Sequence, residues 1–141
     1  MAFGLTITVV ARDDDYLGLE IHVSNNRYAG ATWIFAGNEE LTKFAAQIAG
    51  FPTNARDERR YEFGTRDRSF AGGYCNVHFG CLDSSGHVIV EVAIEDDKQL
   101  NPYERAQLTF RVEAGAIDRF TKALPELERT RSGQAMLPSV D

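Results

Sequence analysis

The sequence predicts an α+β domain with a single, largely antiparallel twisted sheet of about six to seven strands and two amphipathic helices on one face. Several stretches alternate apolar and polar residues at a period of two, as strands with one buried face do. Two other stretches repeat apolar residues at helical spacing. Short connections between strands favour antiparallel pairing, because parallel strands need long crossovers.

The elements are expected in the order β-β-β-α-β-β-β-β-α. A chain of 141 residues suits one domain with a sizeable core. We expect this domain to span residues 1–130. Residues 131–141 lack periodicity and predict a flexible C-terminal tail.

The first part of the chain predicts three strands. Apolar and polar residues alternate over Leu5–Val9 and over Leu17–Val23, so each of these strands has one buried face. The third strand, Tyr28–Ala36, is apolar on both sides, and its inward face stays open. One apolar set comprises Ala29, Ala31, Trp33 and Phe35, and the other comprises Tyr28 and Ile34. We expect Trp33 and Phe35 to pack in the core.

Two segments predict helices. The first spans residues 38–48, where Asn38 is expected to cap the helix. The second begins near Ala114, and Pro125 lies inside its apolar pattern, so we expect a kink or break there. The two apolar faces comprise Leu41, Phe44, Ala45 and Ile48, and then Ile117, Phe120, Leu124 and Leu127. Residues 53–69 predict an exposed connection with a short strand at 61–65.

The clearest element is a β-hairpin over Tyr74–Glu95. Its turn must contain two or four residues, because a slip of one residue would turn every apolar side chain to the wrong face. This register places His78 opposite Glu91 on the polar face. The other predicted pairs are Cys81 with Val88, Phe79 with Val90, Val77 with Val92, Cys75 with Ile94, and Asn76 with Ala93.

Charge and cysteine content limit the partners and the compartment. A net charge of -6 and a pI near 5.1 argue against binding nucleic acid or anionic membranes, and they allow a basic protein partner. The N-terminus lacks the basic region of a signal peptide, and no apolar run reaches the roughly 20 residues that span a bilayer. Cys75 and Cys81 would lie about 20 Å apart on one extended strand, too far for a disulfide. Reduced thiols predict a cytoplasmic protein.

Common catalytic and cofactor-binding motifs are missing, including the Walker loop, GxSxG, HExxH and CxxC. We therefore expect no catalytic residues, no metal site and no cofactor. The best catalytic candidate is His78 with Glu91, because a carboxylate beside a histidine can orient it and favour its protonated form. A cross-strand surface pair is the simpler interpretation, since no nucleophile or oxyanion donor is identifiable beside it.

Candidate binding residues lie in two acidic turns and beside two polar turns. The candidates are Asp13, Asp14, Asp15, Tyr16, Tyr28, Glu95, Asp96 and Asp97, together with His78 and Glu91 of the hairpin. Clustered carboxylates can bind a divalent metal or a basic protein. Their spacing is not that of a calcium loop, and turns also recruit acids for local hydrogen bonds. Tyrosines next to polar turns are typical of interfaces.

Four stretches carry a resemblance that covers roughly Leu17 to Leu124. They read LGLEIHVSNNRYAGATWIFAGNEELTKFAAQIAGFP, YEFG, NVHFGCLDSSGHVIVEVAIEDD and AQLTFRVEAGAIDRFTKAL. Their pattern of strands and helices resembles a broad group of small, mostly uncharacterised bacterial α+β domains. This group includes the WapI-type immunity proteins of contact-dependent and polymorphic toxin systems. The resemblance implies a cytoplasmic, non-enzymatic protein that neutralises a toxin.

Three functional hypotheses follow. The first is a non-catalytic binding domain, immunity-like, whose acidic surface meets a basic partner. The alternative is a small-molecule-binding protein or enzyme with a cavity between the sheet and the helices, and with His78 and Glu91 at its mouth. The third is a homodimer joined through an exposed sheet face, because the third strand is apolar on both sides.

Overall fold

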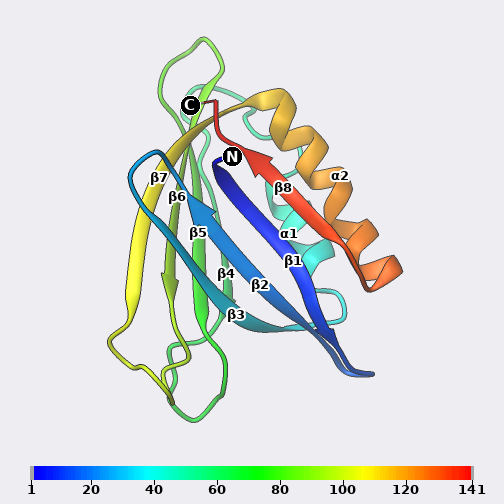
Figure 1. Cartoon of the computed structure of the whole chain (residues 1–141). Helices are drawn as coiled ribbons and strands as arrows, with labels where there is room; N and C mark the ends of the chain where they lie inside the picture. Colours follow the sequence, from blue (N-terminus) through cyan, green and yellow to red (C-terminus); the bar gives the residue numbers. More distant parts are fainter. Residues whose placement is uncertain (1, 141) are drawn as a thin grey trace.

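A computed structural model describes residues 2–140, and within them it contains eight strands and two helices (Figure 1). The elements are β1 (Gly4–Arg12), β2 (Tyr16–Ser24), β3 (Ala29–Gly37), α1 (Glu40–Ile48), β4 (Arg59–Gly64), β5 (Tyr74–Cys81), β6 (His87–Glu95), β7 (Arg105–Glu113), α2 (Ala114–Thr130) and β8 (Gln134–Pro138). No helix within the described residues has the length and apolar character needed to cross a membrane.

The strands form two antiparallel sheets of four. Sheet A has the order β3-β2-β1-β8 and sheet B the order β4-β5-β6-β7. The predicted α+β class is confirmed, but the single sheet is wrong. The segment with α1 carries the chain from β3 into a second layer, where β4 pairs with β5. Alternation shows that a strand has one buried face but not which sheet it joins, because both sheets bury the same kinds of side chain.

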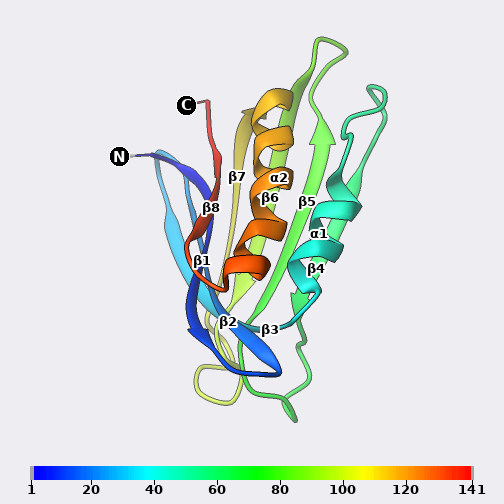
Figure 2. The ribbon, with the colours of Figure 1, turned by 90° about the vertical axis from the view of Figure 1, so that its right-hand side faces the viewer.

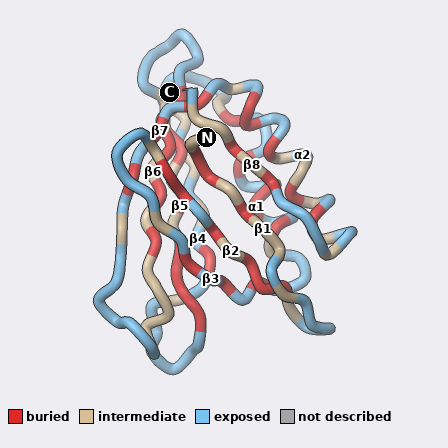
Figure 3. Tube along the Cα trace, in the orientation of Figure 1, coloured by how far each residue is buried: buried red, intermediate tan, exposed pale blue. Residues whose placement is uncertain are grey.

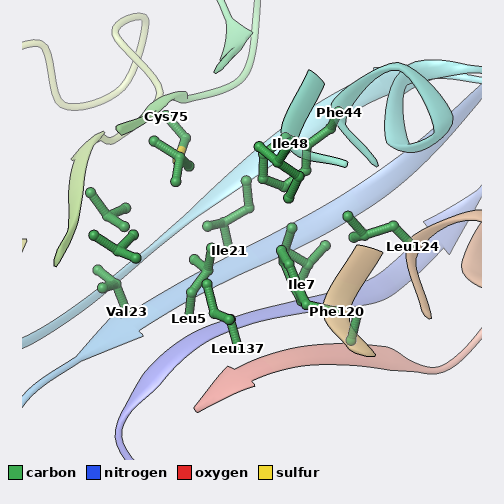
Figure 4. Close-up of a cluster of buried hydrophobic side chains, with 14 of the residues drawn as sticks. Leu5, Ile7, Ile21, Val23, Phe44, Ile48, Cys75, Phe120, Leu124 and Leu137 are labelled. Carbon is green, nitrogen blue, oxygen red and sulfur yellow. The ribbon is translucent and has the colours of Figure 1, made fainter. Parts of the chain in front are cut away.

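The helices lie side by side along one open side of the two-sheet stack, not on one face of a single sheet (Figure 2). Helix α1 contacts β4 and β3, and α2 contacts β8 and β7. The predicted apolar faces of both helices are confirmed, because all eight of those side chains are buried. One core therefore joins the inner faces of both sheets to both helices, with exposed residues concentrated in the turns (Figures 3 and 4).

The predicted register of the β5–β6 hairpin is confirmed. Phe79 lies opposite Val90, His78 lies opposite Glu91, and the other predicted pairs also form. The backbone N–H of Leu82 donates to His87 O at 2.9 Å, which closes a turn of four residues, 83–86. Apolar side chains on one face of each arm determined this register, because only an even-numbered turn buries both sets together.

Helix α2 is continuous across Pro125, so the predicted break is absent. The side chains of Leu124 and Leu127 are buried on either side of the proline. Proline inside a helix costs about 3 kcal/mol, whereas burying each leucine contributes about 1.5–3 kcal/mol. Packing of this face against the core therefore offsets the missing backbone hydrogen bond.

Residues 131–141 were predicted to be a flexible tail; residue 141 lies outside the described residues, and residues 131–140 contain strand β8. Gln134–Pro138 pairs antiparallel with β1, and Leu137 lies opposite Leu5. Ala135 and Leu137 are buried against the core. Five residues offer only two inward positions, too few to show a period in the sequence. The edge of β1, which is distant in sequence, orders this segment by supplying hydrogen-bond partners.

Candidate functional site

Strand β3 buries the face that the sequence left open and exposes its two largest side chains. Ile34 lies opposite Leu19 and faces the core, whereas Trp33 and Phe35 are 47% and 48% exposed. The expectation that Trp33 and Phe35 pack in the core is therefore wrong. The strongly apolar inner face of β2 sets the register of β3, and parity then sends Trp33 and Phe35 outward.

These side chains form part of an exposed aromatic surface on sheet A. We define this aromatic surface as Tyr16, Trp33, Phe35 and Phe70. The ring of Tyr16 packs edge-to-face on that of Phe35, with centroids 5.4 Å apart. Phe35 also packs against Gly72, where a Cβ would come within 2.9 Å of its ring. Two residues before that glycine, Phe70 is 59% exposed. The surface therefore extends from β2 and β3 onto the β4–β5 connection.

A rigid backbone supports the centre of this surface. The hydroxyl of Thr32 donates to Glu95 O at 2.7 Å, and the N–H of Gly73 donates to Trp33 O at 2.7 Å. A Cβ on Gly73 would lie 1.9 Å from Thr32 Oγ1, so only glycine permits this close approach. Strand β3 is thereby tied to sheet B, and its exposed rings are held on a fixed platform.

The acidic turn, Asp13–Asp15, lies between β1 and β2 and leads directly into Tyr16. Its backbone is anchored by two residues that are distant in the sequence. The guanidinium of Arg131 donates to Asp13 O and to Tyr16 O, and Nδ2 of Asn38 donates to Asp14 O at 2.9 Å. These contacts use backbone carbonyls. Asp13 Oδ1 accepts a local hydrogen bond from the N–H of Asp14 at 2.6 Å, and all three residues are exposed to solvent and to a partner. They form an acidic rim beside the aromatic surface.

Asn38 does not cap α1, contrary to the sequence-based expectation. Its side chain instead bridges the acidic turn and Arg131, whose Nη1 donates to Asn38 Oδ1 at 3.1 Å. The first turn of α1 is capped instead by Glu128 of α2. Local sequence favoured Asn38, but the packing of three distant segments decided its partner.

Tyr28 lies at the opposite end of β3 from the acidic turn. It is 68% exposed and lines a depression of about 620 Å³ together with Asn25, Arg27 and residues 107–109 of β7. At one end of the β2–β3 ladder Ser24 pairs with Ala29, next to Tyr28, and at the other end Tyr16 pairs with Gly37. Tyr16 and Tyr28 therefore do not belong to one site.

The second acidic group, Glu95–Asp97, is engaged in local structure. Glu95 accepts a hydrogen bond from Arg66 at 2.6 Å, and Asp96 accepts one from Asn101 Nδ2 at 2.7 Å. Asp97 accepts one from the N–H of Gln99 at 2.9 Å. Asp96 and Asp97 stabilise the β6–β7 loop, as acids in turns often do, whereas Glu95 joins β6 to Arg66 of the β4–β5 connection.

His78 and Glu91 face away from the helices, on the outer face of sheet B. Their neighbours Val77 and Val90 point into the core. The ring of His78 pairs with Glu58 Oε1 at 3.0 Å. The two residues thus do not border a space between the sheet and the helices. Within residues 2–140, no group of three or more His, Cys, Asp and Glu side chains could hold a metal ion.

The two cysteines are free thiols, and Cys75 is fully buried. Burial raises the pKa of the Cys75 thiol well above its ordinary value, because the thiolate would lose its hydration. Burial also raises the pKa of the Cys81 thiol, and the nearby carboxylates of Asp57 and Asp83 raise it further. Neither thiol has the lowered pKa that a nucleophile needs.

The parity argument used for the β5–β6 hairpin could have found the exposed rings. An even-numbered turn at 25–28 pairs Val23 with Gly30 and Leu19 with Ile34, as the structure shows. That register leaves Trp33 facing solvent.

In comparisons with known proteins, no family model, no curated protein and no solved structure matches this chain.

Proposed function

We propose that the chain is a non-catalytic, cytoplasmic binding domain that recognises a basic partner protein through the aromatic surface and the acidic turn. In this role it is immunity-like and neutralises a toxin by covering a functional part of it. The main support for this proposal is that Trp33 and Phe35 lie exposed, side by side, on one rigid strand.

Exposed aromatic rings support a binding role. Trp, Tyr and Arg dominate the binding energy of protein interfaces, and large exposed apolar patches mark such surfaces on soluble proteins. The rings of Tyr16, Trp33 and Phe35 occupy adjacent strands of one sheet, so little conformational freedom is lost when a partner covers them.

The position of the acidic turn supports a basic partner. Charged groups at the rim of an interface steer the encounter and select the partner more than they add affinity. The carboxylates of Asp13–Asp15 project beside Tyr16 from an anchored turn, and the whole chain carries a net charge of -6. A basic toxin domain complements both features.

Co-expression with the protein encoded next to this chain in its native genome tests the proposal, which expects that protein to inhibit growth when it is expressed alone. The wild-type chain should restore growth, and the double variant Trp33→Ala/Phe35→Ala should not. Leu82→Ala is the matched control, because Leu82 is also an exposed large apolar residue (49%) but lies beside the β5–β6 turn. Full rescue by the double variant would overturn the proposed role.

Self-association is the competing use of the same surface. Each copy carries a net charge of -6 over the whole chain, so two copies that met through this surface would repel each other. We therefore expect the isolated chain to be a monomer in light scattering at micromolar concentration. A dimer that the Trp33→Ala/Phe35→Ala change dissociates would assign the aromatic surface to a homodimer instead.

A further inference from the structure

The outer face of sheet B shows how this fold holds an arginine. Tyr74 on β5 and Glu95 on β6 lie directly opposite each other. The guanidinium carbon of Arg66 is 4.4 Å from the centre of the Tyr74 ring, and Nε of Arg66 donates to Glu95 Oε2 at 2.6 Å. One cross-strand pair of an aromatic ring and a carboxylate thus binds a single cation from both sides.

Sheet A carries the same kind of pair without a cation. Glu20 on β2 and Trp33 on β3 lie directly opposite each other, and their neighbours Leu19 and Ile34 face the core. Across residues 2–140, the Glu20 side chain makes no hydrogen bond or ion pair, and no arginine or lysine lies over the Trp33 ring. The pair is therefore complete except for the positive charge.

The surroundings keep this pair accessible. Gly18 precedes Glu20 on the same face of β2 and lies opposite Phe35, so it places no side chain between Glu20 and Phe35. A Cβ on Gly18 would come within 2.9 Å of the Ala11 Cβ, which disfavours any larger residue there. Phe35 provides an apolar surface next to Trp33, and the methylene groups of a long cationic side chain can pack against it.

Arginine suits this pair better than lysine does. A planar guanidinium can stack on a ring and donate to a carboxylate at the same time, and it is more weakly hydrated than an ammonium group. Tryptophan offers the strongest ring for such a contact. Glu20 is half-buried, so its charge is less screened than that of a fully exposed carboxylate.

We propose that Glu20 and Trp33 form a binding site for an arginine side chain of the partner protein, as Tyr74 and Glu95 do for Arg66 within the chain. This inference rests on the proposed function, because it names the group that the partner places on the aromatic surface. The acidic turn would attract the basic partner, and the Glu20–Trp33 pair would select an arginine on it.

Tryptophan fluorescence measures binding at this site directly, because Trp33 is the only tryptophan in the sequence. The probe is a hexa-arginine peptide at low ionic strength, compared with hexa-lysine and hexa-glutamate. We expect a saturable change with hexa-arginine, a weaker one with hexa-lysine and none with hexa-glutamate. Added salt should weaken binding, because the attraction is partly electrostatic.

The decisive variant is Glu20→Gln, which keeps the shape of the side chain and removes its charge. We expect it to weaken hexa-arginine binding about fivefold. The matched control is Glu91→Gln, the same change at an outward, half-buried position in the middle of a strand of sheet B. It alters the net charge equally but should leave the affinity within about twofold of wild type, because Glu91 lies beyond the reach of a cation held at Trp33.

Equal affinities for the two variants, or no response of Trp33 to hexa-arginine, would overturn this inference. Growth rescue separates this failure from failure of the proposed function. If Trp33→Ala/Phe35→Ala abolishes rescue and Glu20→Gln does not, the surface binds its partner without an arginine site. If the double variant still rescues, the proposed function is wrong and the arginine site is wrong with it.

Discussion

Glu128 on α2 caps helix α1: its Oε2 accepts a hydrogen bond from the N–H of Leu41 at 2.8 Å. Its other carboxylate oxygen accepts a hydrogen bond from the Thr42 hydroxyl. These groups lie in the first turn of α1, where backbone N–H groups have no partner within the helix and negative charge is favoured. One carboxylate therefore both caps α1 and joins it to α2.

Replacing Glu128 by alanine should lower the free energy of unfolding by about 1–2 kcal/mol, as loss of a helix cap does. Urea denaturation followed by circular dichroism measures this change. Glu126→Ala is the control, because Glu126 is exposed and pairs only with Arg129 on the surface of the same helix. Its effect should stay within about 0.5 kcal/mol, and an equal loss for both variants would contradict the interhelical cap.

Asp57 anchors the connection after α1 and should make the free energy of unfolding depend on pH in the acidic range. Its hydrogen bonds from Arg59 and from the N–H and hydroxyl of Thr53 lower its pKa from 3.8 to about 2. Because the pKa is lower in the folded state, this contribution is complete above about pH 4 and is lost as the pH falls toward 2.

The variant Asp57→Asn should therefore be less stable than wild type by about 1–2 kcal/mol at pH 7. The difference should shrink between pH 4 and pH 2, where wild-type Asp57 becomes protonated. Urea denaturation across this pH range provides the measurement. A difference that stays constant down to pH 2 would show that the carboxylate charge is not the stabilising feature.

Strand β8 should be part of the cooperative core. Leu137→Ala removes a fully buried side chain and should cost about 2–5 kcal/mol. Met136→Ala is the matched control, because Met136 precedes it on the same strand, lies opposite Thr6 and faces outward. It should cost less than about 1 kcal/mol. Equal, small effects in thermal unfolding would mean that residues 134–138 do not pack stably on β1.

The acidic turn should act mainly on the rate of association. Changing Asp13, Asp14 and Asp15 to asparagine should slow binding of a basic partner about tenfold at low salt and reduce its salt dependence. The dissociation rate should change little, because rim charges steer the encounter. Stopped-flow mixing at two salt concentrations separates these rates. Asp118→Asn, an exposed change on α2, is the control, and a slowing confined to dissociation would place the turn inside the interface.

Sequence periodicity predicted the elements whose partners lie nearby. The β5–β6 register followed from two adjacent apolar patterns and an even-numbered turn. The buried faces of α1 and α2 followed from helical spacing alone. The acidic turn and Tyr16 were also predicted as binding residues; Tyr16 is part of the aromatic surface, and the acidic turn lies next to it in the chain.

Features that depend on distant segments were not predictable in this way. The division into two sheets, the order of β8 and the cap supplied by Glu128 each join residues far apart in the chain. Pro125 also favoured a local break that burial of the neighbouring leucines overrode. A local sequence pattern indicates whether a segment favours a helix, a strand or a break, but it does not indicate the surface against which that segment packs.

By itself, the sequence determined the α+β class, the buried faces of β1, β2 and both helices, and the hairpin register, because these depend on side-chain period and turn parity. Only the tertiary structure decided that Phe35 packs on Tyr16 and Gly72 and that, among residues 2–140, no cation pairs with Glu20 beside Trp33. Both sides of β3 are apolar, so composition did not distinguish them. The inner face of β2, once buried against the core, selected Ile34 for the interior and left the aromatic rings on the surface.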